Sequence, residues 1–559
     1  MATKLRSEGW FDKREYYSFA RKSTWRAQGW TAETTEGRPV IGICNTASDL
    51  NPCNAHFREL AEDVKRGVWA AGGVAAEFPV ISLGEMFLKP TAMLYRNLMS
   101  MDVEEMIRAN PLDAVVLLGA CDKTVPALLM GAASADVPAI LVPGGPMLRG
   151  TWQGKTLGSG TDGRKLFDLY REGTLDEGDM EDLACGLARS AGHCMVMGTA
   201  SSMALVAEAL GMTLPGAAAW PAVDGRRAAL AEASGRRAVE MALAGGPRPS
   251  EVMTREAIEN AIAVLMAAGG STNAVVHLLA IAGRLGVPLK LDDFAAISAR
   301  TPLLADVKPH GEYLMEDFAY AGGGPALMKM LGDCLHLGTR TVKGETLGEA
   351  LERFVPWEQK VIRELAPEGG IRVLRGNLAP EGALIKVSAA SPELLEHRGR
   401  AVVFESKEEM TEKVNDESFA VEPGDVLVLR NAGPLGGPGM PEWGHIPMPK
   451  SLLRRGVKDM VRISDARMSG TSFGTVVLHI SPEARAGGAL GALETGDEIV
   501  LEAGAGRLSV GLDEATIAQR LAVKAGQAQR PPRGYAQLYW DQVEQAHLGC
   551  DFRFLKKQP

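Results

Sequence analysis

The chain is poor in cysteine and in aromatic residues, and it has no excess of basic side chains. Seven cysteines in 559 residues form an odd, sparse set without a CxxC pair, which argues against a disulfide framework. A formal net charge of -9 argues against a nucleic-acid partner, because phosphate binding usually requires a basic face. The remaining composition, 46% hydrophobic and 23% charged, is typical of a soluble globular protein, and the length predicts two domains or more.

Long apolar runs are missing as well. The longest weakly charged stretch, residues 194–223, is interrupted by Glu208 and Pro215, which indicates buried helix and loop rather than a membrane span. The first residues lack the apolar segment of a secretory signal, and Glu8, Asp12 and Glu15 argue against a transit peptide. We therefore expect a cytoplasmic protein with no membrane partner.

Short apolar runs alternate with amphipathic segments in the first part of the chain. The predicted strands are residues 39–44, 78–83, 113–119 and 137–142. Helices are predicted over residues 55–71, from near Pro126, and through most of residues 195–300. This alternation predicts an α/β domain in which helices cover both faces of a parallel sheet.

The pattern changes after about residue 367. Short β-like runs, separated by Gly, Pro and Asp turns, are found at residues 425–430, 459–464, 474–480 and 497–502. They predict a mostly β, barrel-like domain. We interpret the Gly/Pro-rich stretch 366–382 as a linker, and expect an α/β domain over residues 1–367 and a β-rich domain over residues 368–559.

Position within the predicted elements separates the cysteines. Cys53, Cys121 and Cys194 lie in loops that precede helices, where a helix N-terminus stabilises an anion and lowers a thiol pKa. Such loops also converge at the carboxyl ends of parallel strands. Two interpretations stay open: an Fe–S cluster with one open iron, or three unrelated structural cysteines. Cys44, in a predicted strand, and Cys185, in a predicted helix, are interpreted as small buried residues.

Long motifs surround these cysteines and continue along the chain. They are NPCNAH (51–56), LLGACDKTVPALLMGA (117–132), GHCMVMGTASS (192–202), GGSTNAVVHLL (269–279), GGPGMPEW (436–443) and SDARMSGTSFG (464–474). Together they resemble the dihydroxy-acid and sugar-acid dehydratase family, from about residue 35 to about residue 520. The N-terminal segment and LGEMFLKPTAMLYRNLM (83–99) are most similar to the pentonate branch, the arabinonate and xylonate dehydratases.

The resemblance implies two inorganic cofactors. Cys53, Cys121 and Cys194 would ligate an Fe–S cluster, expected to be 2Fe–2S in the sugar-acid branch, with 4Fe–4S as the alternative. A Mg²⁺ site is implied at Glu85, Asp122, Glu442 and a carbamylated Lys123. Carbamylation fits the chemistry, because Mg²⁺ takes oxygen ligands and an unmodified ammonium cannot coordinate it.

The resemblance also assigns the catalytic base to Ser469, with Thr471 beside it. A serine hydroxyl is a poor base unless a nearby positive charge stabilises the alkoxide. This loop is predicted to join two strands of the second domain and to lean over the sheet of the first. The active site is therefore expected at a domain interface, a common location.

The implied activity is that of a hydro-lyase, which converts a sugar acid, a 2,3-dihydroxy carboxylate, into a 2-keto-3-deoxy acid. Iron would act as a Lewis acid without net redox chemistry. The alternative substrate is a branched-chain dihydroxy acid. We expect a small-molecule substrate and a homodimer or homotetramer.

Two further classes of function remain as alternatives. Residues 150–156 contain GxxxGKT, one residue short of a phosphate-binding loop, which would suit a nucleotide-binding enzyme. A non-catalytic Fe–S protein would need the three cysteines but not Glu85, Glu442 or Ser469.

Overall fold

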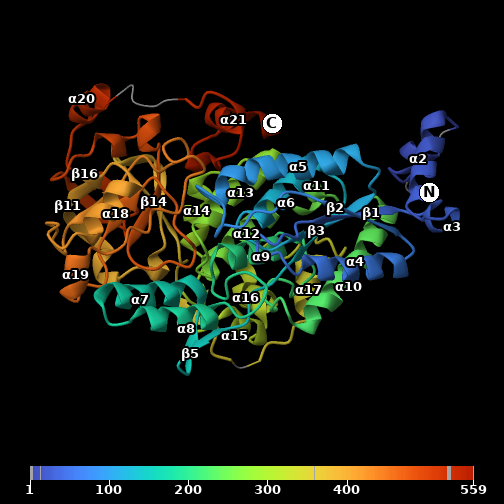
Figure 1. The fold of residues 1–559 in the computed structure, drawn as a ribbon, viewed down its shortest axis with the longest axis horizontal. Helices are drawn as coiled ribbons and strands as arrows, with labels where there is room; N and C mark the ends of the chain where they lie inside the picture. The colour runs from blue at the N-terminus through green and yellow to red at the C-terminus, as the bar shows by residue number, and fades with distance from the viewer. Residues whose placement is uncertain (1–3, 13, 358, 525–529, 558–559) are drawn as a thin grey trace.

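A parallel sheet and a closed barrel form the two halves of the molecule (Figure 1). The structure, a computed structural model, describes residues 4–12, 14–357, 359–524 and 530–557. The predicted fold class is confirmed: an α/β half with helices on both faces of the sheet is followed by a mostly β half.

Four parallel strands in the order β2-β1-β3-β4 make the sheet. They are β1 (Val40–Asn45), β2 (Val74–Pro79), β3 (Ala114–Gly119) and β4 (Ala139–Pro143). β1 and β3 are buried along their whole length, as expected for central strands with both faces covered. The strand predicted at residues 78–83 is wrong, because β2 ends at Pro79 and the Ile81 N–H donates to Asp102 instead of to a strand.

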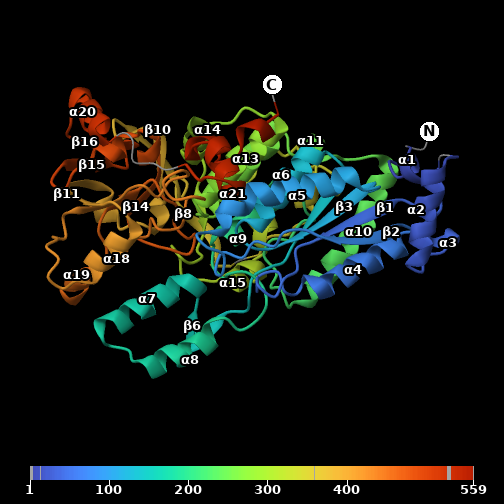
Figure 2. The ribbon, with the colours of Figure 1, turned by 45° about the horizontal axis from the view of Figure 1, so that its top comes forward.

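Helices cover both faces of the sheet (Figure 2). One face carries α4 (Phe57–Ala70) and α10 (Gly225–Ala244), and the other carries α5 (Arg96–Ala109) and α6 (Thr124–Ala135). α4 and α10 pack closely because Gly67 and Gly235 lie at their contact. A Cβ on Gly67 would lie 1.9 Å from the Glu232 carbonyl oxygen.

More helices complete the α/β half, and the predicted helical region is confirmed. Its members are α9 (Thr199–Ala209), α11 (Pro249–Val252), α12 (Arg255–Ala267), α13 (Asn273–Leu285), α14 (Leu291–Ser298), α15 (Met315–Tyr320), α16 (Gly323–Leu331) and α17 (Leu347–Glu352). The chain opens with α1 (Glu8–Phe11), α2 (Tyr16–Ala27) and α3 (Ala32–Thr35). Strands β7 (Leu303–Ala305) and β8 (Ile362–Ala366) pair with each other outside the main sheet.

Eight strands close the barrel in the order β10-β14-β13-β12-β11-β15-β16-β9. They are β9 (Arg372–Gly376), β10 (Ala379–Ile385), β11 (Glu396–Phe404), β12 (Val426–Leu429), β13 (Arg462–Ser464), β14 (Val476–Ser481), β15 (Glu498–Glu502) and β16 (Arg507–Val510). The barrel half also holds α18 (Lys407–Asn415), α19 (Lys450–Arg454) and α20 (Glu514–Lys524). Of the linker predicted at 366–382, residues 367–371 connect β8 to the barrel, but residues 372–382 belong to the β9–β10 hairpin, so that part of the interpretation is wrong. The predicted domain limits stay a prediction.

A hairpin followed by two helices projects from the α/β half toward the barrel (Figure 2). These are β5 (Gly150–Trp152), β6 (Lys155–Leu157), α7 (Ser159–Glu172) and α8 (Glu177–Leu187). The GxxxGKT stretch is therefore a β-hairpin turning at Gln153 and Gly154, with φ of 47° and 76°. A phosphate-binding loop needs a strand-to-helix turn, so the nucleotide-binding alternative is wrong.

The C-terminal tail leaves the barrel and returns to the α/β half. It contains α21 (Gly534–Gln542), and Asp551 forms a buried ion pair with Arg284 at 2.6 Å. Arg96 donates to the carbonyl oxygens of Gly549 and Cys550. In the described part of the chain, no helix combines the length and the apolar character needed to cross a membrane.

Candidate active site

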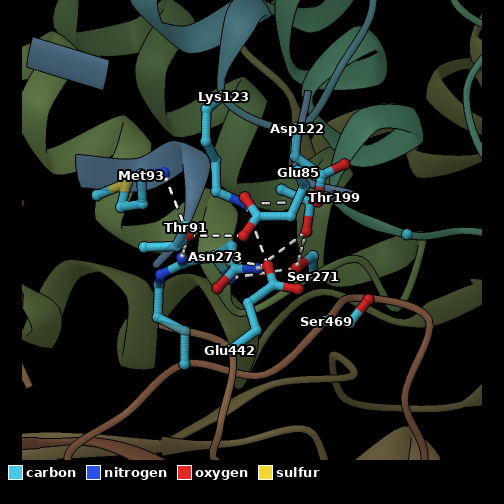
Figure 3. Close-up of polar contacts among 12 residues, drawn as sticks. Glu85, Thr91, Met93, Asp122, Lys123, Thr199, Ser271, Asn273, Glu442 and Ser469 are labelled. Atoms are coloured by element: carbon cyan, nitrogen blue, oxygen red, sulfur yellow. Dashed lines mark hydrogen bonds and ion pairs between the residues drawn. The ribbon is translucent and has the colours of Figure 1, made fainter. Parts of the chain in front are cut away.

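Three acidic side chains from separate loops surround the ammonium group of Lys123 (Figure 3). Its Nζ lies 3.3 Å from Glu85 Oε2, 3.4 Å from Asp122 Oδ2 and 3.1 Å from Glu442 Oε1. Asp122 and Lys123 follow β3, and Glu85 lies in the loop after β2, at the same edge of the sheet. Glu442 comes from the loop between β12 and α19. The structure thus brings together the four residues of the predicted Mg²⁺ site.

Burial and charge set the protonation of this group. Burial raises the pKa of Glu442, but the cations of Lys123 and Arg467 outweigh it and hold this pKa at about 2. Burial also raises the pKa of Glu85 and of Asp122, and here it prevails over the pull of Lys123. Burial disfavours the ammonium of Lys123, yet Glu442 and Glu85 raise its pKa above the ordinary value. The three carboxyl groups can therefore be ionised together only when a cation lies among them.

Arg467 links the carboxylates of the two halves, a role that sequence reasoning missed. Its Nη1 donates to Glu442 Oε1 at 2.9 Å and its Nη2 donates to Thr91 Oγ1 at 3.0 Å. Thr91 in turn donates to Glu85 Oε1 at 2.6 Å. The available signal was a charged residue two positions before Ser469 in a motif of mostly small side chains.

Asn273, the first residue of α13, joins the same network. Its Nδ2 lies 3.1 Å from Glu442 Oε1 and 3.0 Å from Thr199 Oγ1, and Thr199 Oγ1 lies 2.9 Å from Ser271 Oγ. Asn273 Oδ1 is buried and has no hydrogen-bond partner within the described ranges. An unsatisfied buried acceptor beside the carboxylates suits a bound donor at this position.

The Ser469 loop connects β13 and β14 and lies beside the carboxylates (Figure 3). Ser469 Oγ is 3.0 Å from Thr471 Oγ1. Between them, Gly470 presses against the start of α9, where a Cβ would lie 2.6 Å from the Thr199 backbone nitrogen. Only glycine allows this approach, so the loop is positioned by the opposite half of the molecule.

The three predicted cluster cysteines also come together. Cys53 contacts Cys121 through a side-chain hydrogen bond, and Cys194 is near enough to act on its charge. The contact with Cys121, followed by burial, raises the pKa of Cys53, and burial raises that of Cys194 to about 12. Helix N-termini were expected to lower the pKa of these thiols. For Cys53 and Cys194 without a bound cation this expectation is wrong, because burial and neighbouring acidic groups raise the pKa more than a helix N-terminus lowers it.

The other cysteine interpretations have mixed outcomes. Cys44 is buried in β1, as predicted. Cys185 lies in α8, also as predicted, but it is exposed, so its interpretation as a buried residue is wrong. The projecting α7–α8 pair has its own small apolar cluster and leaves this side chain at the surface.

The donor chemistry fits the implied cofactors. No three His, Cys, Asp or Glu side chains of the described residues form a metal site as they stand. Glu85, Asp122 and Glu442 do not form a metal site because the Lys123 ammonium occupies the position between them. A carbamylated Lys123 would exchange this cation for an oxygen donor and leave excess negative charge, which a divalent cation balances. The three adjoining thiols would likewise be stabilised as thiolates by iron.

Acidic, sulfur and hydroxyl groups thus meet where the two halves contact each other, and they form the candidate active site. Family models match both halves: the dihydroxy-acid/6-phosphogluconate dehydratase N-terminal model over residues 38–350 and the C-terminal model over residues 359–550. The chain belongs to this dehydratase family. It is an enzyme of the hydro-lyase class, which excludes the non-catalytic Fe–S alternative.

Curated relatives match over nearly their whole length. The chain is 53% identical to L-arabonate dehydratase of Azospirillum brasilense, covering 99% of this chain and 97% of the relative. It is 49% identical to L-arabinonate dehydratase of Rhizobium leguminosarum bv. trifolii, over 99% and 96%. It is 45% identical to 6-deoxy-6-sulfo-D-gluconate dehydratase of Pseudomonas putida, over 99% and 96%.

Proposed function

We propose that this enzyme dehydrates an aldonate, a sugar acid with hydroxyls on C2 and C3, to the 2-keto-3-deoxy acid. The observation that carries the proposal is the convergence of Glu85, Asp122 and Glu442 on Lys123, beside the Ser469 loop. Relatives named for arabinonate and sulfogluconate support a sugar-acid substrate. A homodimer or homotetramer in the cytoplasm is part of the proposal.

The cofactors belong to the proposal as well. Cys53, Cys121 and Cys194 would hold a 2Fe–2S cluster, and Glu85, Asp122, Glu442 and a carbamylated Lys123 would hold Mg²⁺. When bound, these groups supply Lewis acidity for the leaving C3 hydroxyl and for the charge that develops on the substrate carboxylate and C2 oxygen.

The chain's own residues move the proton. Ser469 Oγ, as an alkoxide, takes the proton from C2, and the C–H electron pair forms the C2–C3 double bond as hydroxide leaves C3. The resulting enol tautomerises to the 2-keto acid, so the substrate loses one water and no electron is transferred. Arg467 and Asn273 keep Glu442 in place through their hydrogen bonds to Oε1.

An anaerobic turnover panel tests this function. Enzyme with its cluster is incubated with pentonates, hexonates and 2,3-dihydroxyisovalerate, and the 2-keto acid is measured as a carbonyl derivative. We expect turnover of at least one aldonate, and loss of turnover in Ser469→Ala with the cluster absorbance unchanged. Turnover of dihydroxyisovalerate alone would favour the branched-chain alternative, and no 2-keto acid from any substrate would overturn the assignment.

A further inference from the structure

The projecting arm is the segment from β5 to α8, residues 150–187. The first turn of its helix α7 contacts the Ser469 loop. Thr161 Oγ1 donates to the Thr471 carbonyl oxygen at 2.7 Å. Gly160 lies so close that a Cβ there would be 2.4 Å from Thr471 Oγ1. The arm is therefore packed against the residue that neighbours Ser469.

Arg164, one turn further along α7, reaches the Thr471 side chain. Its Nη1 donates to Thr471 Oγ1 at 2.7 Å and to the Gly160 carbonyl oxygen at 2.9 Å. Both acceptors are uncharged, and no carboxylate of the described residues lies within ion-pair distance of this guanidinium. The guanidinium therefore makes no ion pair among the described residues, and Thr471 Oγ1 is one of its two direct hydrogen-bond partners.

The direction of the hydrogen bonds follows from the chemistry of these groups. A guanidinium can only donate, so it engages a lone pair of Thr471 Oγ1 and makes the Thr471 hydroxyl a stronger donor. An alkoxide at Ser469 can only accept. The 3.0 Å contact between the two hydroxyls is then a bond from Thr471 to Ser469, and the Thr471 backbone N–H adds a longer one at 3.4 Å.

We propose that Arg164 is a positioning residue that acts through Thr471 to stabilise the Ser469 alkoxide. The proposal rests on the proposed role of Ser469 as base. Arg164 does not need to touch the substrate: it holds the Thr471 proton toward Ser469 and places a positive charge one hydroxyl away from the base. Burial lowers the pKa of Arg164, while Glu442, Cys194 and Asp168, which face it, favour its charged form.

Kinetics of Arg164→Gln test the proposal in the enzyme with its cluster. We expect kcat to fall roughly 10- to 100-fold, the range for loss of a charge-assisted hydrogen bond, with KM nearly unchanged. The alkaline pH at which kcat becomes maximal should move upward, because the Ser469 hydroxyl is then harder to ionise. Arg164→Lys, which keeps one charged donor, should recover part of kcat.

A matched control removes a different cation near the same place. Lys458 and Arg164 both line a cavity of about 420 Å³ between α7 and the barrel, but no hydrogen bond joins Lys458 to Thr471 among the described residues. Lys458→Gln should keep the wild-type kcat and pH profile. An equal fall in kcat in this variant would assign the effect to the cavity's charge and overturn the proposal.

A double-mutant cycle tests whether Arg164 acts through Thr471, which we call the relay, or only supports the local structure. In Thr471→Val the hydroxyl is gone, so adding Arg164→Gln should change kcat by less than about twofold. Independent, multiplying losses would overturn the relay, as would a wild-type kcat and pH profile in Arg164→Gln. In both cases an inactive Ser469→Ala would leave the proposed function standing. Full activity of Ser469→Ala would instead overturn both the proposed role of Ser469 as base and the proposed role of Arg164.

Discussion

The two halves of the molecule bring their groups to the active site in different ways. Cys121, Asp122 and Lys123 come directly after β3 and are fixed by a buried sheet. Glu442 and Ser469 lie on longer barrel loops, whose glycines contact the other half: Gly439 faces Leu94 and Gly470 faces Thr199. The groups after β3 are thus held by local structure, whereas Glu442 and Ser469 are held by contacts between the two halves.

The largest effect is expected on the sheet side. Cys53→Ser should lose the visible absorbance of the cluster and all measurable turnover, because a serine hydroxyl ionises too weakly to replace a thiolate. Cys185→Ser, at an exposed cysteine of α8, should keep both. Iron and sulfide analysis with absorbance spectra checks this pair, and a normal cluster in Cys53→Ser would remove that residue from the ligand set.

A single added methyl group in the Ser469 loop should lower kcat. In Gly470→Ala the Cβ would lie 2.6 Å from the Thr199 nitrogen, so the loop must move away and displace Ser469. We expect kcat to fall about 100-fold, with cluster absorbance retained. Gly424→Ala is the control, since a Cβ there meets nothing within 4 Å. Equal kinetics of the two variants would show that the loop tolerates the shift.

Arg467 connects the two sides, so its loss should weaken Mg²⁺ binding more than it weakens the fold. Lysine cannot donate to both Glu442 and Thr91 as the guanidinium does. After removal of Mg²⁺ with a chelator and back-titration, Arg467→Lys should need about tenfold more Mg²⁺ for half-maximal activity. Arg430→Lys, at a buried arginine whose hydrogen bonds go to Glu405, Gly491 and Leu493 instead, should titrate like wild type.

The smallest expected effect concerns stability alone. Burial raises the pKa of Glu208, in α9, from 4.5 to about 7, although the N–H groups of Gly216 and Ala218 favour its charged form. Because the folded pKa lies above the unfolded one, the stability gained below about pH 4.5 is lost as the pH rises through about 7.

From about pH 5 to about pH 8 the wild type should lose roughly 1–3 kcal/mol that Glu208→Gln does not lose. Thermal midpoints of both proteins at the two pH values measure this difference. Parallel pH dependence of the two midpoints would contradict the prediction.

Local pattern predicted the sheet better than it predicted the contacts of the site. β1, β3 and four barrel strands, β12 to β15, fall where apolar runs indicated them, whereas β9, β10, β11 and β16 were not predicted as strands. The strand at β2 was displaced because the apolar run continues past Pro79, where pairing ends. Residues 372–382, part of the β9–β10 hairpin, were interpreted as a linker because turns and linkers share glycine and proline.

The motifs of the resemblance named the acidic and sulfur groups, but two arginines were missed. Arg467 acts through Thr91, and Arg164 acts through Thr471, from positions far apart in the sequence. Such contacts depend on how the halves pack, which no local spacing encodes. The stretch just before α7 has a spacing close to that of a phosphate-binding loop, but it forms the β5–β6 hairpin.

The tail that returns to the α/β half has a consequence for the order of folding. Arg96 and Arg284 are buried, and besides nearer partners such as Asn97 and Ser100 each has acceptors at residues 549–551. During synthesis, both guanidinium groups leave the ribosome hundreds of residues before those acceptors do. The first half therefore reaches its final packing only after residue 551 has been synthesised, and a fragment that ends before residue 549 would have to bury two arginines without these acceptors.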